Sequence, residues 1–208
     1  MEIKTYIVED FQVNCYLVAD EKMRECVIID AGGVSHELDE YINTKGYAVK
    51  YLIFTHGHFD HIGGAGYYRN KYPNAKILIH SADSACLTDE RANFTYPAPY
   101  HFVPVKPDVL LKDKDVISFG NVKLKTIHTP GHTLGGISLY SDGVLFSGDT
   151  LFYRSVGRTD FYGGDFKTLK RSVMRLYELP DNTVVYAGHG CTTTLAEEKF
   201  ENPYVRVE

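Results

Sequence analysis

The most informative segment of this chain reads Thr55-His56-Gly57-His58-Phe59-Asp60-His61-Ile62-Gly63-Gly64. Four side chains that can bind a metal ion lie within six residues, directly after an apolar run at residues 51–55 that we predict to be a buried strand. A strand end holds its loop rigidly, and the glycines allow the loop to fold back tightly. His56 and His58 can then face one metal ion while Asp60 and His61 face a second.

Three later loops repeat this arrangement of a predicted strand followed by a glycine-flanked ligand residue. They read Thr129-Pro130-Gly131-His132-Thr133, Gly148-Asp149-Thr150 and Gly188-His189-Gly190. A single histidine near the end of a strand is more often a hydrogen-bonded structural residue than a ligand. Four loops that together contain seven potential ligands, five of them histidines, indicate instead a site for two divalent metal ions.

Strands and helices alternate through most of the chain, which favours an α/β (α+β) fold. Apolar runs predict strands at residues 3–8, 15–19, 26–30, 51–55, 76–79, 122–128, 137–140, 144–147 and 183–187. Helical spacing and capping residues predict helices at residues 36–45, 65–72, 166–177 and 195–200. The first strands look antiparallel, which argues against a purely parallel βαβ sheet. Two packed sheets with helices outside satisfy both observations.

The length and charge of the chain bear on its number of domains and on the partners it can have. A chain of 208 residues favours one domain over residues 1–208. Lys and Arg number 22 against 27 Asp and Glu, and the net charge of −5 argues against a nucleic-acid partner. Apolar runs are far shorter than the roughly 20 residues that span a bilayer, and the N-terminus lacks a signal-peptide core. We therefore expect a cytoplasmic protein, monomer or small homo-oligomer, with no membrane partner.

Residues 87–108 differ from the rest of the chain because aromatic residues and prolines interrupt any regular periodicity. Long irregular segments in a compact domain are usually functional or mobile. We interpret this segment as a candidate lid. An ordered surface loop with no role in function is the alternative interpretation.

The first loop matches in full the H-x-H-x-D-H motif of the metallo-β-lactamase superfamily, which the chain resembles over nearly its whole length. The resemblance implies an αβ/βα four-layer sandwich with two divalent metal ions at one edge between two sheets. Zinc is the expected metal, with iron or manganese as alternatives. By this resemblance, the first ion would be held by His56, His58 and His132. The second ion would be held by Asp60, His61 and His189, and Asp149 would bridge the two ions.

Within the superfamily, residues 129–133, 148–152, 155–161 and 188–190 resemble the short bacterial glyoxalase II-like (hydroxyacylglutathione hydrolase-like) proteins. The resemblance implies hydrolysis of a small-molecule acyl thioester. Two departures leave the thiol carrier open. The C-terminal helical domain of full-length glyoxalase II does not follow His189, and Arg158 and Asp160 stand about where those enzymes use Lys and Tyr. Arg158 is a candidate substrate contact, with an internal ion pair to Asp160 or Asp165 as the alternative.

The expected reaction is attack of a metal-bridging hydroxide on the thioester carbonyl, because two cations that share a water make hydroxide available at neutral pH. Asp60 can accept the hydroxide's proton and thus be a catalytic residue. The alternative function is that of a mononuclear-iron persulfide dioxygenase-like oxidoreductase. That branch also carries a segment like residues 157–161, but it uses one iron and fewer of these ligands.

Overall fold

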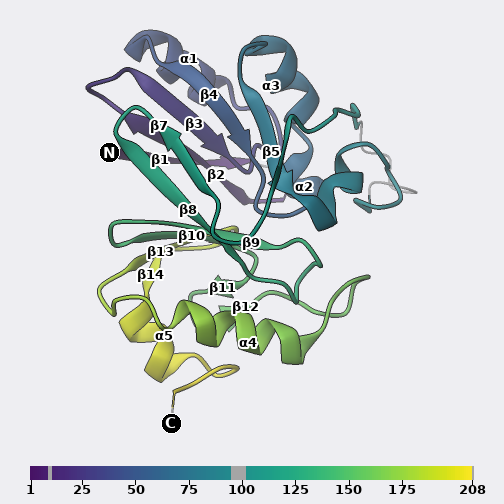
Figure 1. The fold of residues 1–208 in the computed structure, drawn as a ribbon, viewed down its shortest axis with the longest axis vertical. Helices are drawn as coiled ribbons and strands as arrows, with labels where there is room; N and C mark the ends of the chain where they lie inside the picture. Colours follow the sequence, from purple (N-terminus) through teal and green to yellow (C-terminus); the bar gives the residue numbers. More distant parts are fainter. Residues whose placement is uncertain (9–10, 95–101, 208) are drawn as a thin grey trace.

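The structure, a computed structural model, describes residues 1–8, 11–94 and 102–207 of the chain. Two six-stranded sheets pack against each other, and helices cover their outer faces (Figure 1). The predicted α/β (α+β) class and the αβ/βα four-layer sandwich are confirmed by this arrangement.

The first sheet has three antiparallel strands followed by three that extend it in parallel. In spatial order they are β1 (Glu2–Val8), β2 (Val13–Asp20), β3 (Glu25–Ile29), β4 (Ala48–Ile53), β5 (Lys76–His80) and β6 (Val109–Leu111). The helical segments of this half are α1 (His36–Lys45), α2 (Phe59–Ile62), α3 (Ala65–Lys71) and the 3₁₀ helix η1 (Ser81–Leu87).

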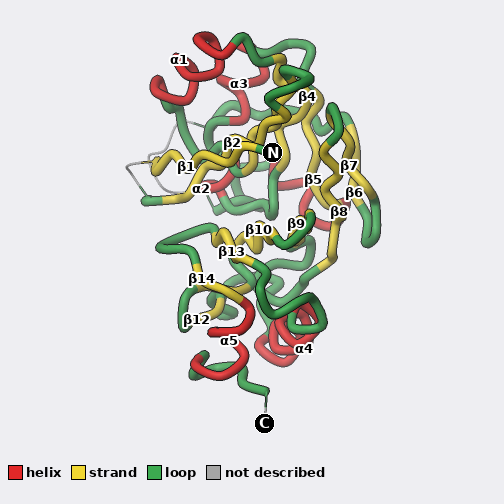
Figure 2. The backbone as a smooth tube through the Cα atoms, turned by 90° about the vertical axis from the view of Figure 1, so that its left-hand side faces the viewer, coloured by secondary structure: helices red, strands yellow, loops and turns green. Residues whose placement is uncertain are grey.

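The second sheet is antiparallel except where β10 and β13 pair in parallel. In spatial order its strands are β14 (Thr193–Thr194), β13 (Val184–Ala187), β10 (Val144–Gly148), β9 (Ile137–Ser141), β8 (Val122–His128) and β7 (Val116–Phe119). A short hairpin, β11 (Leu151–Phe152) and β12 (Ser155–Val156), precedes the helices α4 (Phe166–Leu176) and α5 (Leu195–Glu201). Figure 2 shows α1 and α3 at one end of the molecule and α4 and α5 at the other.

Three buried clusters separate the four layers. Val27 and Ile28 are neighbours on β3, yet Val27 packs in the cluster between the sheets and Ile28 in the cluster beneath the first helical layer. Successive side chains of a strand point to opposite faces, so a strand buried on both faces is apolar throughout. A third cluster, which includes Val173 and Val185, joins the second sheet to α4 and α5.

The helix ends agree closely with the sequence prediction because capping residues mark them. The Ser35 side chain accepts a hydrogen bond from the Leu38 amide at the start of α1, and Gly46 ends that helix with φ of 64°. The Asp165 side chain accepts from the Thr168 amide at the start of α4. In the described part of the chain, no helix is long and apolar enough to cross a membrane.

The two sheets are joined at the edge where β2 meets the end of β13. Asn14 donates through Nδ2 to the carbonyl oxygens of Ala187 at 3.0 Å and Gly190 at 2.9 Å. Its backbone N–H donates to the Gly188 carbonyl at 2.8 Å. These bonds hold the loop that contains His189 against the first sheet, and the loops that follow β4, β8 and β10 contribute to the same region.

Candidate metal centre

The seven side chains predicted as metal ligands lie together, although they come from four loops and two sheets. Their ligand atoms form three groups, each with all atoms within 4.8 Å of one another. The groups are His56, His58 and His132; Asp60, His61 and His189; and His56, His61 and Asp149. The first two are the sets implied for two separate ions.

Asp149 lies between the two sets. Its Oδ2 is 3.4 Å from His132 Nε2 and 3.7 Å from His189 Nε2, and its Oδ1 is 3.4 Å from His61 Nε2. One carboxylate therefore reaches histidines of both sets, as a bridging ligand requires. The neighbouring His61 lowers the pKa of Asp149 although burial alone would raise it, so the group is a carboxylate at neutral pH.

The unpaired atoms of the cluster test whether these residues fit metal ions. Among the described residues, the buried atoms without a hydrogen-bond partner include Nε2 of four histidines and Oδ1 of the central aspartate: His56, His58, His61, His132 and Asp149. Buried polar atoms are nearly always paired, and leaving one unpaired costs about 1–3 kcal/mol. Imidazole nitrogens and carboxylate oxygens that converge without partners fit a pair of divalent cations.

The opposite ring nitrogens are already occupied, which fixes how the rings point. His61 donates through Nδ1 to Asp30 Oδ2 at 3.0 Å, and His132 donates through Nδ1 to the Arg158 carbonyl at 2.7 Å. His56 Nδ1 lies 3.1 Å from the Thr55 hydroxyl, which itself donates to Asp30. Such bonds leave Nε2 free to bind a cation. Asp30, which directly follows β3, thus orients the His61 ring.

Burial keeps two histidines of the first set, His56 and His58, neutral. Burial, followed by the nearby His132, lowers the pKa of His58 to about 3, and burial lowers the pKa of His56 well below its usual range. A neutral imidazole is the form that binds a metal ion. These two side chains therefore need no deprotonation at neutral pH before a cation enters.

Asp83 is a residue of the site that the sequence analysis missed. It is 4% exposed in η1, and its Oδ2 accepts the Gly57 amide at 3.0 Å while its Oδ1 accepts the Gly135 amide at 2.7 Å. Gly57 stands between two ligands of the first loop, and Gly135 stands in the His132 loop. Asp83 thus joins the two loops that carry the first set. Its position just after β5, at the strand edge where Asp30 follows β3, is the signal that could have revealed it.

A cavity of about 500 Å³ opens beside the cluster. Phenylalanines from separate segments line it together with several of the ligand residues: Phe11, Phe59, Phe94, Phe152 and Phe161. Arg158 also lines this cavity. Its guanidinium donates to both carboxylate oxygens of Asp160, at 2.7 and 2.6 Å, so the internal pair that the sequence left open is present.

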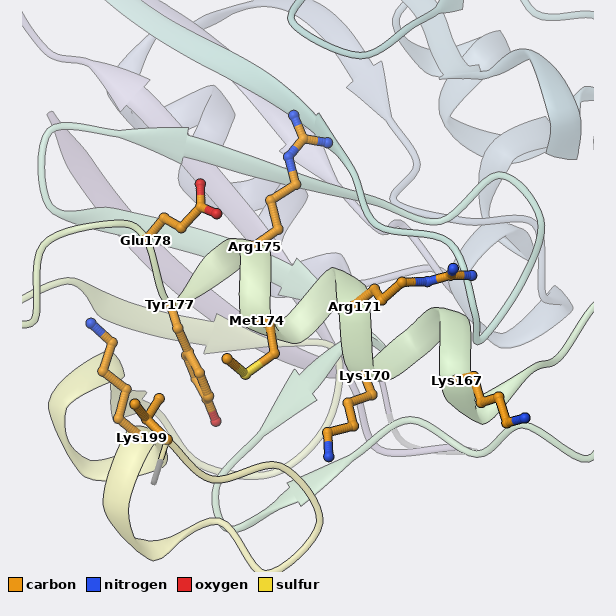
Figure 3. Close-up of a pocket in the computed structure, with 9 residues that line it drawn as sticks. Lys167, Lys170, Arg171, Met174, Arg175, Tyr177, Glu178 and Lys199 are labelled. Carbon is orange, nitrogen blue, oxygen red and sulfur yellow. The ribbon is translucent and has the colours of Figure 1, made fainter.

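A larger cavity of about 690 Å³ lies between α4 and the segment around α5 (Figure 3). Basic side chains surround an apolar floor there, and none of the seven clustered residues lines it. Metal chemistry therefore belongs to the smaller cavity.

The candidate lid falls partly outside the described residues, because its segment 95–101 is not among them. Its two flanks are fixed to the first helical layer. Leu87, Phe102 and Val105 are buried in the cluster beneath that layer, and Phe94 lines the smaller cavity. Whether the segment closes over the site stays a prediction.

The model of the metallo-beta-lactamase superfamily matches residues 8–189. The chain belongs to this superfamily. Among curated proteins, it is 39% identical over 208 residues to an uncharacterized protein of Aquifex aeolicus, covering 98% of this chain and 97% of the other. It is 35% identical to the probable metallo-hydrolase YqgX of Bacillus subtilis, covering 93% and 92%. It is 32% identical to the hydroxyacylglutathione hydrolase GloC of Haemophilus influenzae, covering 99% and 98%.

Solved structures agree with the superfamily assignment. The BLEG-1 B3 metallo-beta-lactamase superposes with a TM-score of 0.89 at 32% identity, covering 98% of this chain and 99% of the other. TTHA1623 in a di-iron-bound form gives 0.83 at 32% identity, covering 97% and 100%. ETHE1 from Myxococcus xanthus gives 0.80 at 29% identity, covering 98% and 84%. Membership of the superfamily and the His/Asp cluster support a metal-dependent hydrolase with a divalent metal site.

Proposed function

We propose that this protein is a dinuclear metal-dependent hydrolase of small acyl thioesters, with zinc as the expected metal and only a modest dependence on glutathione as the thiol carrier. The observation that carries the proposal is the pair of three-residue ligand groups with Asp149 between them. An enzyme that worked with one iron and fewer ligands would have no use for the second group.

The comparisons support hydrolysis more than any other chemistry. One relative is named a probable metallo-hydrolase and another a hydroxyacylglutathione hydrolase, and each covers nearly the whole chain. Hydroxyacylglutathione is a thioester, so this likeness favours an acyl thioester as the substrate class. The di-iron form of TTHA1623 makes iron the first alternative to zinc.

The proposed chemistry assigns distinct tasks to the side chains of the site. When bound, the two cations supply electrophilic polarisation of the carbonyl and acidify water. Asp60 lines the cavity and its carboxylate lies 3.5 Å from His189 Nε2, so it can both accept a proton and be oriented by its neighbour. The thiol leaves as a thiolate, which is stable enough near neutral pH to need no proton donor.

The walls of the cavity explain why glutathione is expected to bind weakly. Glutathione carries two carboxylates, which cations recognise best. Arg158 is the one Arg or Lys among the described lining residues, and its guanidinium is paired with Asp160. Contacts that lie away from the reacting carbonyl affect KM more than kcat.

A persulfide dioxygenase-like oxidoreductase is the second candidate, favoured by residues 157–161, which resemble that branch. Oxygen uptake with glutathione persulfide distinguishes it from a hydrolase. The likeness to the BLEG-1 B3 metallo-beta-lactamase makes a β-lactam a necessary member of the same substrate panel.

The test combines elemental analysis with that panel. Protein purified without chelator is assayed with lactoylglutathione, with the lactoyl thioester of a short uncharged thiol, with a β-lactam and with glutathione persulfide. We expect close to two metal ions per chain and hydrolysis of both thioesters. Protein stripped by a chelator is the control and should regain activity when the metal returns.

Three outcomes would overturn parts of the proposal. One ion at saturation, with Asp60 and His61 dispensable, contradicts the dinuclear centre. A hundredfold loss of kcat/KM when glutathione is replaced by the short thiol contradicts the weak dependence on the carrier. Oxygen uptake without hydrolysis of any thioester would assign the protein to the oxidoreductase alternative.

A further inference from the structure

Phenyl rings line the cavity beside the His/Asp cluster, and some of them lie next to the histidine rings of that cluster. The centroid of Phe94 is 5.2 Å and that of Phe161 is 5.8 Å from the centroid of His58. The two phenyl rings are 5.1 Å from each other. A further lining ring, that of Phe152, lies 6.2 Å from the His189 ring, which belongs to the second set. A group bound next to the reacting carbonyl therefore meets aromatic carbon beside histidines of both sets.

Phe94 is held in this wall at a conformational cost. Its φ of 66° lies in the left-handed region, which bulky side chains rarely adopt. Such conformations are strained, persist only where the surroundings enforce them, and concentrate at binding and active sites. The strained backbone and the ring contact with Phe161 thus point to the same conclusion, that the position of this ring matters to the site.

The walls offer little to a polar substituent. Beyond the cluster residues, Arg158 supplies the polar side chain among the described lining residues. Its guanidinium makes two hydrogen bonds to Asp160 and lies 3.9 Å above the centre of the Phe161 ring. Apart from the cluster residues, the described side chains of the wall would give a hydroxyl or carboxylate no free partner in exchange for its lost water, which weakens binding.

We infer that this cavity receives the acyl part of the substrate and selects unsubstituted, apolar acyl groups over hydroxyacyl and carboxyacyl groups. The inference rests on the proposed thioester hydrolysis and narrows its substrate class. The acyl part is assigned to the cavity because a thiol carrier such as glutathione is charged, and the described lining residues include no Arg or Lys that is free to pair with it. A volume of about 500 Å³ lies within the range of sites for small molecules.

The magnitude of the preference follows from apolar burial. Each buried methylene strengthens binding about fourfold, so kcat/KM should rise about fourfold per methylene until the cavity is filled. A hydroxyl buried without a partner should lower kcat/KM on the order of tenfold relative to the same acyl group without it.

The experiment uses the metal-loaded protein and thioesters that share one short uncharged thiol. The acyl groups are propionyl, butyryl, hexanoyl and lactoyl, the last differing from propionyl by a single hydroxyl. Binding of the corresponding thioethers, which cannot be hydrolysed, is measured by calorimetry. We expect hexanoyl to exceed propionyl in both assays, and lactoyl to fall about tenfold below propionyl.

Variants of the lining residues test whether the phenyl rings cause the preference for apolar acyl groups. Phe161→Ala and Phe94→Ala each remove one ring of the wall and should lower the hexanoyl-to-propionyl ratio about tenfold, with metal content unchanged. Tyr162→Ala is the control, because Tyr162 follows Phe161 in the chain yet is 82% exposed and does not line the cavity. It should leave the ratio as in the wild type.

The readouts separate failure of this inference from failure of the proposed function. Thioester hydrolysis in which lactoyl equals or exceeds propionyl would overturn the apolar preference and leave the hydrolase intact. A second series varies the thiol with the acyl group constant, and dependence on the length of the thiol alone would overturn the acyl assignment. If no thioester is hydrolysed, the proposed function is wrong. The affinities of the thioethers would then still show whether the cavity prefers apolar groups.

Discussion

The carboxylate of Asp83 accepts the backbone N–H of Gly135 at 2.7 Å, and through this bond the short helix η1 holds the His132 loop. The other oxygen of the same carboxylate holds the first ligand loop at Gly57. A Cβ added at Gly135 would lie 2.6 Å from Asp83, so glycine is what permits this approach. The spacing between two loops of the metal site is thus set by a side chain that binds no metal.

Replacing Asp83→Asn should lower the affinity for the first metal ion about tenfold, a typical effect for residues that orient ligands. An Asn side chain retains one acceptor oxygen, and its NH₂ group would face the second amide as another donor. Metal affinity is measured by competition with a chelating dye. Asp142→Asn, an exposed change in the turn between β9 and β10, is the control. Unchanged affinity for both ions in D83N would show that the loops hold their spacing without this carboxylate.

Replacing Asp149→Asn should lower kcat/KM more than His56→Ala does. The Asp149 carboxylate reaches histidines of both sets, so its loss weakens both sites and leaves two cations to repel each other. Elemental analysis should return fewer than one ion per chain at a metal concentration that saturates the wild type. Full metal content together with wild-type turnover would contradict the bridging position.

Acid should weaken the join between the two sheets at Asp20. Hydrogen bonding, first from the Asn121 amide, lowers the pKa of this carboxyl. Asp20 accepts from the Asn121 amide at 2.7 Å and from the Asn121 side chain at 2.9 Å, linking the end of β2 to the turn between β7 and β8. The folded-state pKa lies below the unfolded one. This stabilisation is therefore present above about pH 4 and is lost as the pH falls through the lower value.

Urea unfolding of the metal-free protein between pH 7 and pH 3 tests this expectation, since bound metal would add its own pH dependence. Asp20→Asn should be less stable than the wild type at pH 7, and the difference should shrink below about pH 4. A difference that stays constant over the whole range would mean that the charge of Asp20 contributes nothing.

Replacing Asp160→Asn should broaden the acyl specificity. The hydrogen bonds from Arg158 lower the pKa of Asp160 to about 2, and the same bonds occupy the guanidinium. Release of Arg158 should raise kcat/KM about threefold for a thioester whose acyl group carries a carboxylate, and should leave kcat/KM for the propionyl thioester unchanged. The gain should decrease at high salt, because salt screens the charge of Arg158. A loss for every acyl group, together with lost metal, would instead show that the pair orders the loop, since the Arg158 carbonyl accepts from His132.

Local signals in the sequence predicted many of the helices and strands and most residues of the candidate site. Ser35 and Gly46 cap α1 as predicted, because capping depends on residues within one turn of the helix end. The seven clustered side chains were found because each follows a strand and stands beside glycine or within one dense loop. Parallel and hairpin strands bring such loops to one edge of a sheet, so a local pattern predicted a long-range contact.

The remaining features depend on tertiary packing that no local pattern encodes. Strand β7 was missed because Val116 is 57% exposed and the strand is short, so its pairing with β8 decides its structure. No local pattern marks Asp83, because the two amides that it accepts lie 26 and 52 residues away in the sequence. The phenyl wall unites Phe11, Phe94 and other rings from segments with no shared spacing.

In the proposed dinuclear centre, the ligands of each ion come from loops of both sheets, so each ion would join the two halves of the chain. The first half of the chain, through β6, supplies His56, His58, Asp60 and His61, and the second half supplies the rest. Neither half holds three ligands for either ion. A protein cut in the connection between β6 and β7 would therefore present two fragments that share a cation, and a chelator in the solvent would remove the coordinate bonds between them. Metal supply would then control reassembly, a property useful for building a split reporter from this fold.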